Sequence, residues 1–213
     1  MDSMSRTERA ALCNTALEAG EHAPTLCGRW TVKDLVIHLL VRERDPLGAP
    51  GILFPQLEHL TDLSARRLAR QDFSSLVERV RSGPPAWSPM SLPQLDKAVN
   101  TLEYFVHHED IRRAGTEWVP RELTAREQKV IWKSIAMSGK GLVRAAGVPV
   151  EIRWPGEERD RTAVLRRGSD PVVVSGQPAE LTMFLFGREQ YAGLEFGGPE
   201  ASVKKLTATG LGL

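Results

Sequence analysis

The segment at residues 100–114 constrains the fold most, because it reads as one helix that mixes ionisable and apolar side chains. Glu103 and His107 lie four residues apart, and residues at this spacing share a helix face with Cβ atoms about 5–6 Å apart. Leu102 and Phe105 border the pair, and a carboxylate beside an apolar face is costly to bury without a partner. The segment therefore predicts a helical bundle in which another element supplies that partner.

His38 is the candidate partner, because it lies in the middle of an otherwise apolar helical stretch at residues 31–44. Two histidines and one glutamate are a common ligand set for catalytic zinc, with the fourth position left to water or substrate. If His38, Glu103 and His107 converge, the sequence predicts a site for one divalent metal ion. The alternative is a core histidine that is hydrogen bonded to a neighbouring group, with Glu103 facing solvent.

Three residues outside this set have expected positions or roles of their own. His108 is rotated by about 100° from His107 on a helix, so we expect it to point outward or to contact the edge of the bundle. Asp110 either orients an imidazole N–H or holds Arg113, or it belongs to a solvated helix end. For Cys27, the favoured interpretation is a small buried packing residue.

Composition excludes several classes of partner. With 28 basic and 27 acidic residues the net charge is +1, so nothing favours nucleic acid or an anionic membrane surface. The apolar stretches are too short to span a bilayer, and the polar N-terminus lacks the apolar core of a signal peptide. Two cysteines fit a reducing compartment, so we expect a cytoplasmic protein. No phosphate-binding glycine loop or nucleophile elbow is present.

Apolar periodicity predicts an α+β chain: an up-and-down helical bundle in residues 1–147 and a small α+β domain in residues 148–213. A capping box of Thr31 and Asp34 marks the start of the second helix. We expect helices at about 4–19, 31–44, 55–70, 73–81, 93–114, 124–146, 178–186 and 200–206, and strands at about 148–154, 162–165, 172–174 and 191–196.

Four segments carry a resemblance to a known family. The stretches 30–38 (WTVKDLVIH) and 103–110 (EYFVHHED) resemble the two metal-binding motifs of the mycothiol-dependent maleylpyruvate isomerase family, within the DinB-like superfamily of four-helix bundles. The stretches 176–181 (GQPAEL) and 186–188 (FGR) resemble its small C-terminal α+β domain. The similarity covers almost the whole chain and is nearest to an actinobacterial subgroup.

The resemblance implies one divalent ion, usually zinc, held by His38, Glu103 and His107, with an open position for a thiol or water. It also implies mycothiol as the thiol cofactor and an arginine of the C-terminal domain as a contact for an acidic substrate, for which Arg188 is the nearest match. Other superfamily members are thiol S-transferases. Residues 41–92 are specific to the subgroup, so maleylpyruvate itself is not carried over as the substrate.

We therefore expect a zinc-dependent, mycothiol-utilising S-transferase or isomerase that acts on a small electrophile, as a monomer or homodimer. One alternative is a non-enzymatic, metal-stabilised bundle that binds a small molecule or a protein. Another is metal-assisted hydrolysis, for which Asp34, Glu109 or Asp110 would be the general base.

Overall fold

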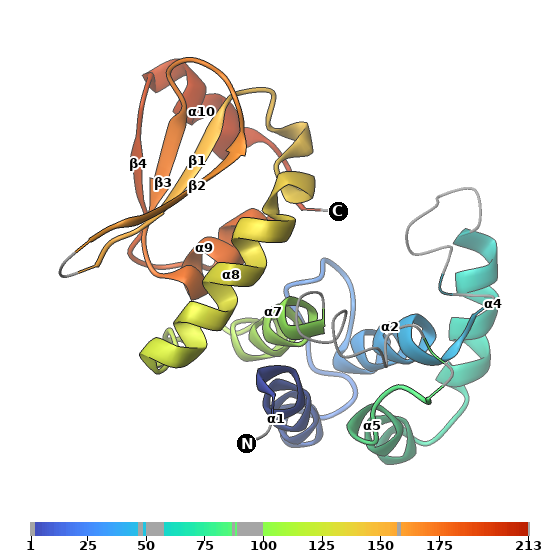
Figure 1. Ribbon diagram of the computed structural model, residues 1–213. Helices are drawn as coiled ribbons and strands as arrows, with labels where there is room; N and C mark the ends of the chain where they lie inside the picture. The colour runs from blue at the N-terminus through green and yellow to red at the C-terminus, as the bar shows by residue number, and fades with distance from the viewer. Residues whose placement is uncertain are drawn as a thin grey trace. The chain divides into compact units, whose positions relative to one another are not determined.

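The computed structural model describes residues 3–46, 49, 58–86, 88, 100–156 and 159–212 (Figure 1). Contacts divide the chain into two compact units, Met1–Trp118 and Val119–Leu213. The described residues contain eight α-helices and one four-stranded sheet, so the predicted α+β class is confirmed. None of the helices within these residues is long and apolar enough to cross a membrane.

The first unit is helical. Its described helices are α1 (Met4–Ala19), α2 (Val32–Arg44), α4 (Glu58–Ala69), α5 (Phe73–Arg81) and α7 (Thr101–Arg112). Helix α1 packs against α5 and α7, while α2 packs against α4 and α5. Their apolar faces form one core, whose fully buried members include Leu12, Leu35, Leu39, Leu76 and Tyr104.

Helix α2 shows how local sequence positions the site. The Thr31 hydroxyl accepts from the Asp34 backbone N–H, and the Asp34 carboxylate accepts from the Thr31 N–H at 2.9 Å, so the predicted capping box is confirmed. These bonds satisfy donors that a helix start otherwise leaves unpaired. The helix ends at Arg44, two residues before Pro46, and its apolar residues are buried on both sides of His38.

The second unit packs helices on a mixed sheet. It contains α8 (Ala125–Leu142), a 3₁₀ turn (Arg144–Ala146), β1 (Val150–Trp154), β2 (Arg161–Arg166), β3 (Val172–Ser175), α9 (Pro178–Leu185), β4 (Glu195–Gly197) and α10 (Glu200–Ala208). The strand order is β2-β1-β3-β4, with β1 and β3 parallel and the two outer pairs antiparallel.

Alternation along the two central strands buries one face of the sheet. Val150 and Ile152 on β1 pair in register with Val172 and Val174 on β3, and all four side chains are fully buried. Successive strand residues point to opposite faces, so this alternation is what a half-buried sheet requires. The chain enters β1 after Gly147, whose φ of +65° favours glycine.

Most predicted elements occur within a few residues of their expected bounds. The strand expected at 191–196 is the short β4, and the start of the helix expected at 93–114 falls outside the described residues. Helix α8 was assigned from sequence to the bundle, whereas contacts group it with α9 and β2 in the second unit. The division at residue 147, drawn from a change in sequence pattern, stays a prediction.

Candidate metal centre

Helix α7 is buried around almost its whole circumference, although it carries three carboxylates and two imidazoles. Buried ionisable groups are costly unless they find partners. On one side of α7, Glu103 and His107 meet His38 of α2. On another side, His108 meets Glu8 of α1. The polar content of α7 is therefore matched by polar residues on both neighbouring helices.

His38, Glu103 and His107 converge as the sequence predicts. The Nε2 atoms of His38 and His107 each lie 3.3 Å from Oε1 of Glu103. The two imidazole rings are 5.3 Å apart between centroids, nearly edge to face. One donor atom from each residue lies within 4.8 Å of the other two, so the three can face one ion.

The donor spacing is consistent with a small divalent cation. Nitrogen and oxygen ligands lie about 2.0–2.2 Å from zinc, so two ligands of a tetrahedral ion are about 3.3–3.5 Å apart. Both His–Glu separations, at 3.3 Å, fall at this value. The side chains are also largely removed from solvent, with exposed fractions of 15% for His38, 18% for Glu103 and 11% for His107.

Arg42 supplies a positive charge beside the carboxylate. Its Nε lies 3.5 Å from Oε1 of Glu103, and its Nη1 donates to Oδ1 of Asn100 at 2.9 Å. Burial alone would raise the pKa of Glu103, but Arg42 and the two imidazoles hold that pKa well below its ordinary value. Burial lowers the pKa of His38, and its hydrogen bond with Glu103 opposes this only in part. These shifts favour a charged carboxylate and a neutral His38, which are the forms that bind metal.

The other nitrogen of His107 meets a second carboxylate. Nδ1 of His107 lies 2.9 Å from Oδ2 of Asp110, which is fully buried. Burial would lower the pKa of His107, but its hydrogen bonds with Asp110, Cys27 and Glu103 raise it well above the ordinary value. A carboxylate on the far nitrogen is the usual support of a metal-bound histidine, because it fixes the ring and increases its basicity. Among the roles predicted for Asp110, contact with an imidazole is the one observed.

Cys27 joins this group, contrary to the expectation that it only packs. Its thiol donates to Oδ2 of Asp110 at 3.0 Å and lies 3.8 Å from Nδ1 of His107. The loop that carries it is anchored by the Leu26 N–H, which donates to the Asp110 carbonyl at 3.0 Å. Cys27, His107 and Asp110 form a second set of donors within 4.8 Å of one another, which shares His107 with the first.

Two further expectations are corrected. His108 does not point outward: it is 4% exposed, and its two nitrogens lie 3.1 Å from Glu8 Oε2 and 3.0 Å from Thr15 Oγ1. The end of α7 is not solvated, because Arg113 is 1% exposed and pairs with Glu109. Trp30 is 39% exposed, and its ring centroid lies 5.1 Å from that of His38.

Arg188 belongs to the second unit. It follows α9, and Nη1 of its guanidinium donates to the carbonyl of Phe186. It lines a cavity of about 290 Å³ together with the aromatic side chains of Phe184 and Tyr191 and residues of the α10 C-terminus.

No model of a known protein family matches the chain, and no curated protein matches it in sequence. Among solved structures, a mutant of the mycothiol-dependent maleylpyruvate isomerase, in which a histidine is replaced by alanine, superposes with a TM-score of 0.56 at 14% identity. The structure of the mycothiol-dependent maleylpyruvate isomerase itself gives 0.51 at 17% identity. Each match covers 91% of this chain and 90% of the other. The chain shares the fold of this isomerase, so the resemblance expected from the motifs is confirmed at that level.

Proposed function

We propose that this protein is a zinc-dependent, mycothiol-utilising enzyme, a thiol S-transferase or an isomerase, that acts on a small electrophilic substrate. The observation that carries the proposal is the convergence of His38, Glu103 and His107 at the donor spacing of a single ion. The fold shared with a mycothiol-dependent isomerase supports the choice of thiol. Fold alone does not fix chemistry, so the donor geometry is the stronger support.

The helical unit would provide a rigid frame for this site. Helix α1 packs against α5 and α7, α2 packs against α5, and side chains of α2 reach α7 through His38 and Arg42. We propose that these four helices form the up-and-down bundle expected from the sequence. Ligands on facing helices of a bundle are held by packed cores rather than by loops, which favours a preorganised metal site.

Each residue of the site has a definable task. His38 and His107 would bind the ion through Nε2, and Glu103 through Oε1. Asp110 would hold the proton on Nδ1 of His107 and so keep Nε2 free as the donor. Arg42 keeps Glu103 ionised. A divalent ion held by these residues would lower the pKa of a bound thiol, so that the sulfur would be a thiolate near neutral pH.

The protein would then present that thiolate to an electrophilic carbon. In a transfer, the sulfur forms a bond to the carbon, and the displaced group leaves with the bonding electrons. In an isomerisation, the thiol adds to the substrate and is later eliminated, so it is regenerated. Trp30, partly exposed and next to His38, offers an apolar surface for the substrate. Arg188, which lines a cavity of the second unit, is the proposed contact for an acidic group of the substrate.

Metal-assisted hydrolysis is less well supported, because the three carboxylates considered as general bases are engaged elsewhere. Asp34 caps α2 through Thr31. Glu109 accepts from Arg112 and Arg113. Asp110 is hydrogen bonded to the Cys27 thiol and contacts His107. A hydrolase needs a base that can reach the attacking water, whereas each of these three carboxylates already makes hydrogen bonds within the protein.

Titration of cobalt-loaded protein with mycothiol tests the proposal. Co²⁺ replaces Zn²⁺ in sites of this kind and adds a thiolate-to-metal absorption band when sulfur binds. We expect a saturable band with mycothiol and none with S-methyl mycothiol, which lacks the free thiol. A cobalt spectrum that is unchanged by mycothiol would instead support the non-enzymatic, metal-stabilised bundle.

A further inference from the structure

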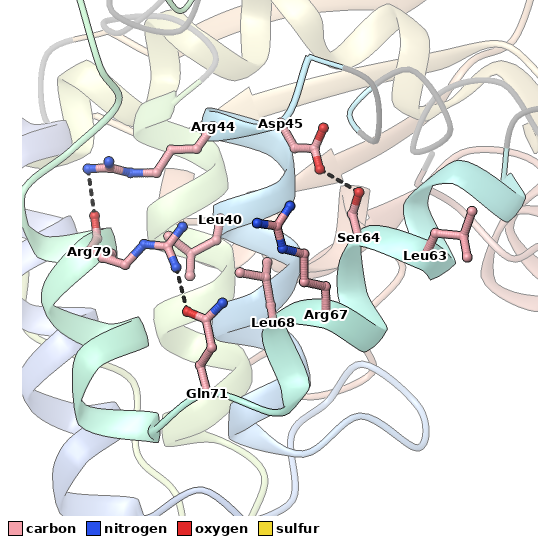
Figure 2. Close-up of a pocket in the computed structure, with 9 residues that line it drawn as sticks. All are labelled: Leu40, Arg44, Asp45, Leu63, Ser64, Arg67, Leu68, Gln71 and Arg79. Atoms are coloured by element: carbon pink, nitrogen blue, oxygen red, sulfur yellow. Dashed lines mark hydrogen bonds between the residues drawn. The ribbon is translucent and has the colours of Figure 1, made fainter.

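A second cavity, of about 550 Å³, lies in the helical unit between α2, α4 and α5 (Figure 2). This volume falls in the range of pockets that hold small organic ligands, about 300–1,000 Å³. The residues that line it come from the C-terminal half of α2, from α4, from the turn after α4 and from α5: Leu40, Arg44, Asp45, Leu63, Ser64, Arg67, Leu68, Gln71 and Arg79.

This cavity is separate from the candidate metal centre, although both use α2. His38 and Arg42 lie on the face of α2 that meets α7. Leu40 and Arg44 are each two positions further along, which corresponds to a rotation of about 200° around the helix. They therefore lie on the opposite face, toward α4 and α5. A ligand in this cavity would not contact the proposed metal ligands.

The lining carries an excess of positive charge. Three arginines face one aspartate, Asp45, whose carboxylate accepts a hydrogen bond from Ser64. Arg44 uses Nη2 for hydrogen bonds within the protein, because this atom donates to the carbonyl of Arg79 at 3.0 Å and to the hydroxyl of Ser82 at 2.6 Å. Its Nε is buried with no hydrogen-bond partner among the described residues.

The other two arginines keep donors for a ligand. Nη1 of Arg79 donates to Oε1 of Gln71 at 2.8 Å, which fixes the side chain and leaves further N–H groups. Arg67 has no hydrogen bond or ion pair within the part of the chain that the structure describes. Figure 2 shows its side chain reaching from α4 toward α2, over the cavity. Arginine binds carboxylates and phosphates well because its planar fork offers paired donors.

Leucines supply the apolar part of the lining. Leu40 is buried, while Leu63 is 62% exposed at the cavity and is one of the larger apolar side chains left open to solvent. Leu68 completes this group. A cavity with two available guanidinium groups and three leucines matches a molecule that has an acidic head and an apolar body.

We propose that this cavity binds a small organic anion, with its carboxylate or phosphate on Arg67 and Arg79 and its apolar part on Leu40, Leu63 and Leu68. The site is distinct from the proposed thiol chemistry. It would allow an acidic metabolite to bind on one face of α2 while His38 acts on the other.

Isothermal titration calorimetry with phenyl phosphate tests the proposal. Inorganic phosphate serves as a probe of the acidic head alone, and benzyl alcohol as a probe of the apolar body alone. Arg67→Ala removes one of the two proposed contacts and, being exposed, leaves the core intact. Arg66→Ala is the matched control, because Arg66 is the exposed neighbour on α4 and does not line the cavity. We expect phenyl phosphate to bind saturably and Arg67→Ala to weaken it about tenfold, which corresponds to about 1.4 kcal/mol. Arg66→Ala should bind as the parent protein does.

Methyl NMR locates the ligand independently. Phenyl phosphate should shift the methyl resonances of Leu40, Leu63 and Leu68. The Arg67→Lys variant, which keeps the charge but loses the fork, should bind with intermediate affinity. The proposal is overturned if phenyl phosphate does not bind saturably, if the two alanine variants lose affinity equally, or if the three leucines do not respond. Failure here would leave the cobalt and mycothiol titration unaffected, so the two proposals can fail separately.

Discussion

Asp110→Asn should weaken metal binding without unfolding the protein. Asp110 contacts one of the three proposed metal ligands, His107, at 2.9 Å between Oδ2 and Nδ1. Asparagine has nearly the same shape, and its amide oxygen can still accept from Nδ1. The substitution therefore removes the charge of the partner and leaves a neutral hydrogen bond, which is about half as strong.

The expected change in metal affinity follows from the hydrogen bond that remains between the amide oxygen and Nδ1 of His107 in Asp110→Asn. Loss of a group that supports a metal-bound histidine lowers metal affinity by about 10–100-fold. Because the amide retains part of the interaction, we expect Asp110→Asn to lie near the lower end, about tenfold or about 1.4 kcal/mol. Asp110→Ala removes the acceptor altogether and should approach the upper end. Competition between the protein and a zinc chelator measures both values.

The loss of metal affinity in Asp110→Asn should also depend on pH. Asp110 helps to raise the pKa of His107, so in the parent protein a proton competes with the ion more strongly. Asp110→Asn lowers that pKa and relieves part of the competition. The difference in affinity between parent and variant should therefore be larger at about pH 8.5 than at about pH 6.5.

Glu8→Gln is the matched control. Glu8 is a buried carboxylate of α1 that lies 3.1 Å from Nδ1 of His108, which neighbours His107 on α7 and is not one of the proposed ligands. Its substitution should cost stability and leave zinc affinity unchanged. Wild-type affinity in folded Asp110→Asn, or an equal loss in Glu8→Gln, would refute the assigned role of Asp110.

Three other predictions concern the rest of the chain. Burial raises the pKa of Cys13 to about 12, so at about pH 8 iodoacetamide should label Cys27 first and Cys13 only after unfolding; peptide mass spectrometry distinguishes them. Ile152→Ala, in the fully buried centre of β1, should cost about 2–5 kcal/mol in urea unfolding. Thr124→Ala removes the capping box of α8 and should cost about 1 kcal/mol in the same assay.

Local sequence was sufficient for most of the fold because the elements follow simple periodicities. The capping boxes at Thr31 and Thr124 start α2 and α8, and the alternation of Val150 and Ile152 defines β1. The unit to which α8 belongs does not follow from such a pattern. The apolar stripe of α8 indicates that this face is buried against another element. Which element buries it depends on tertiary contacts, here with α9 and β2.

The site was partly predictable for the same reason. Glu103 and His107 share a helix face by spacing, and His38 stands out as an imidazole within an apolar stretch. Cys27 lies on a loop without periodicity and reaches Asp110 across 83 positions of the chain, so no local pattern indicates the contact. The expectation that His108 points outward was wrong because α7 is buried on several sides, and a rotation of 100° leads to α1 rather than to solvent.

Metal content of the purified protein tests the central claim most directly. Elemental analysis of the parent protein and of Glu103→Ala, each checked for helical content by circular dichroism, gives the stoichiometry and its dependence on one proposed donor. We predict about one zinc per chain in the parent protein and a folded, metal-poor Glu103→Ala variant. A parent protein that takes up no metal after reconstitution, or a variant that retains a full equivalent, would contradict the assignment of His38, Glu103 and His107 as metal ligands.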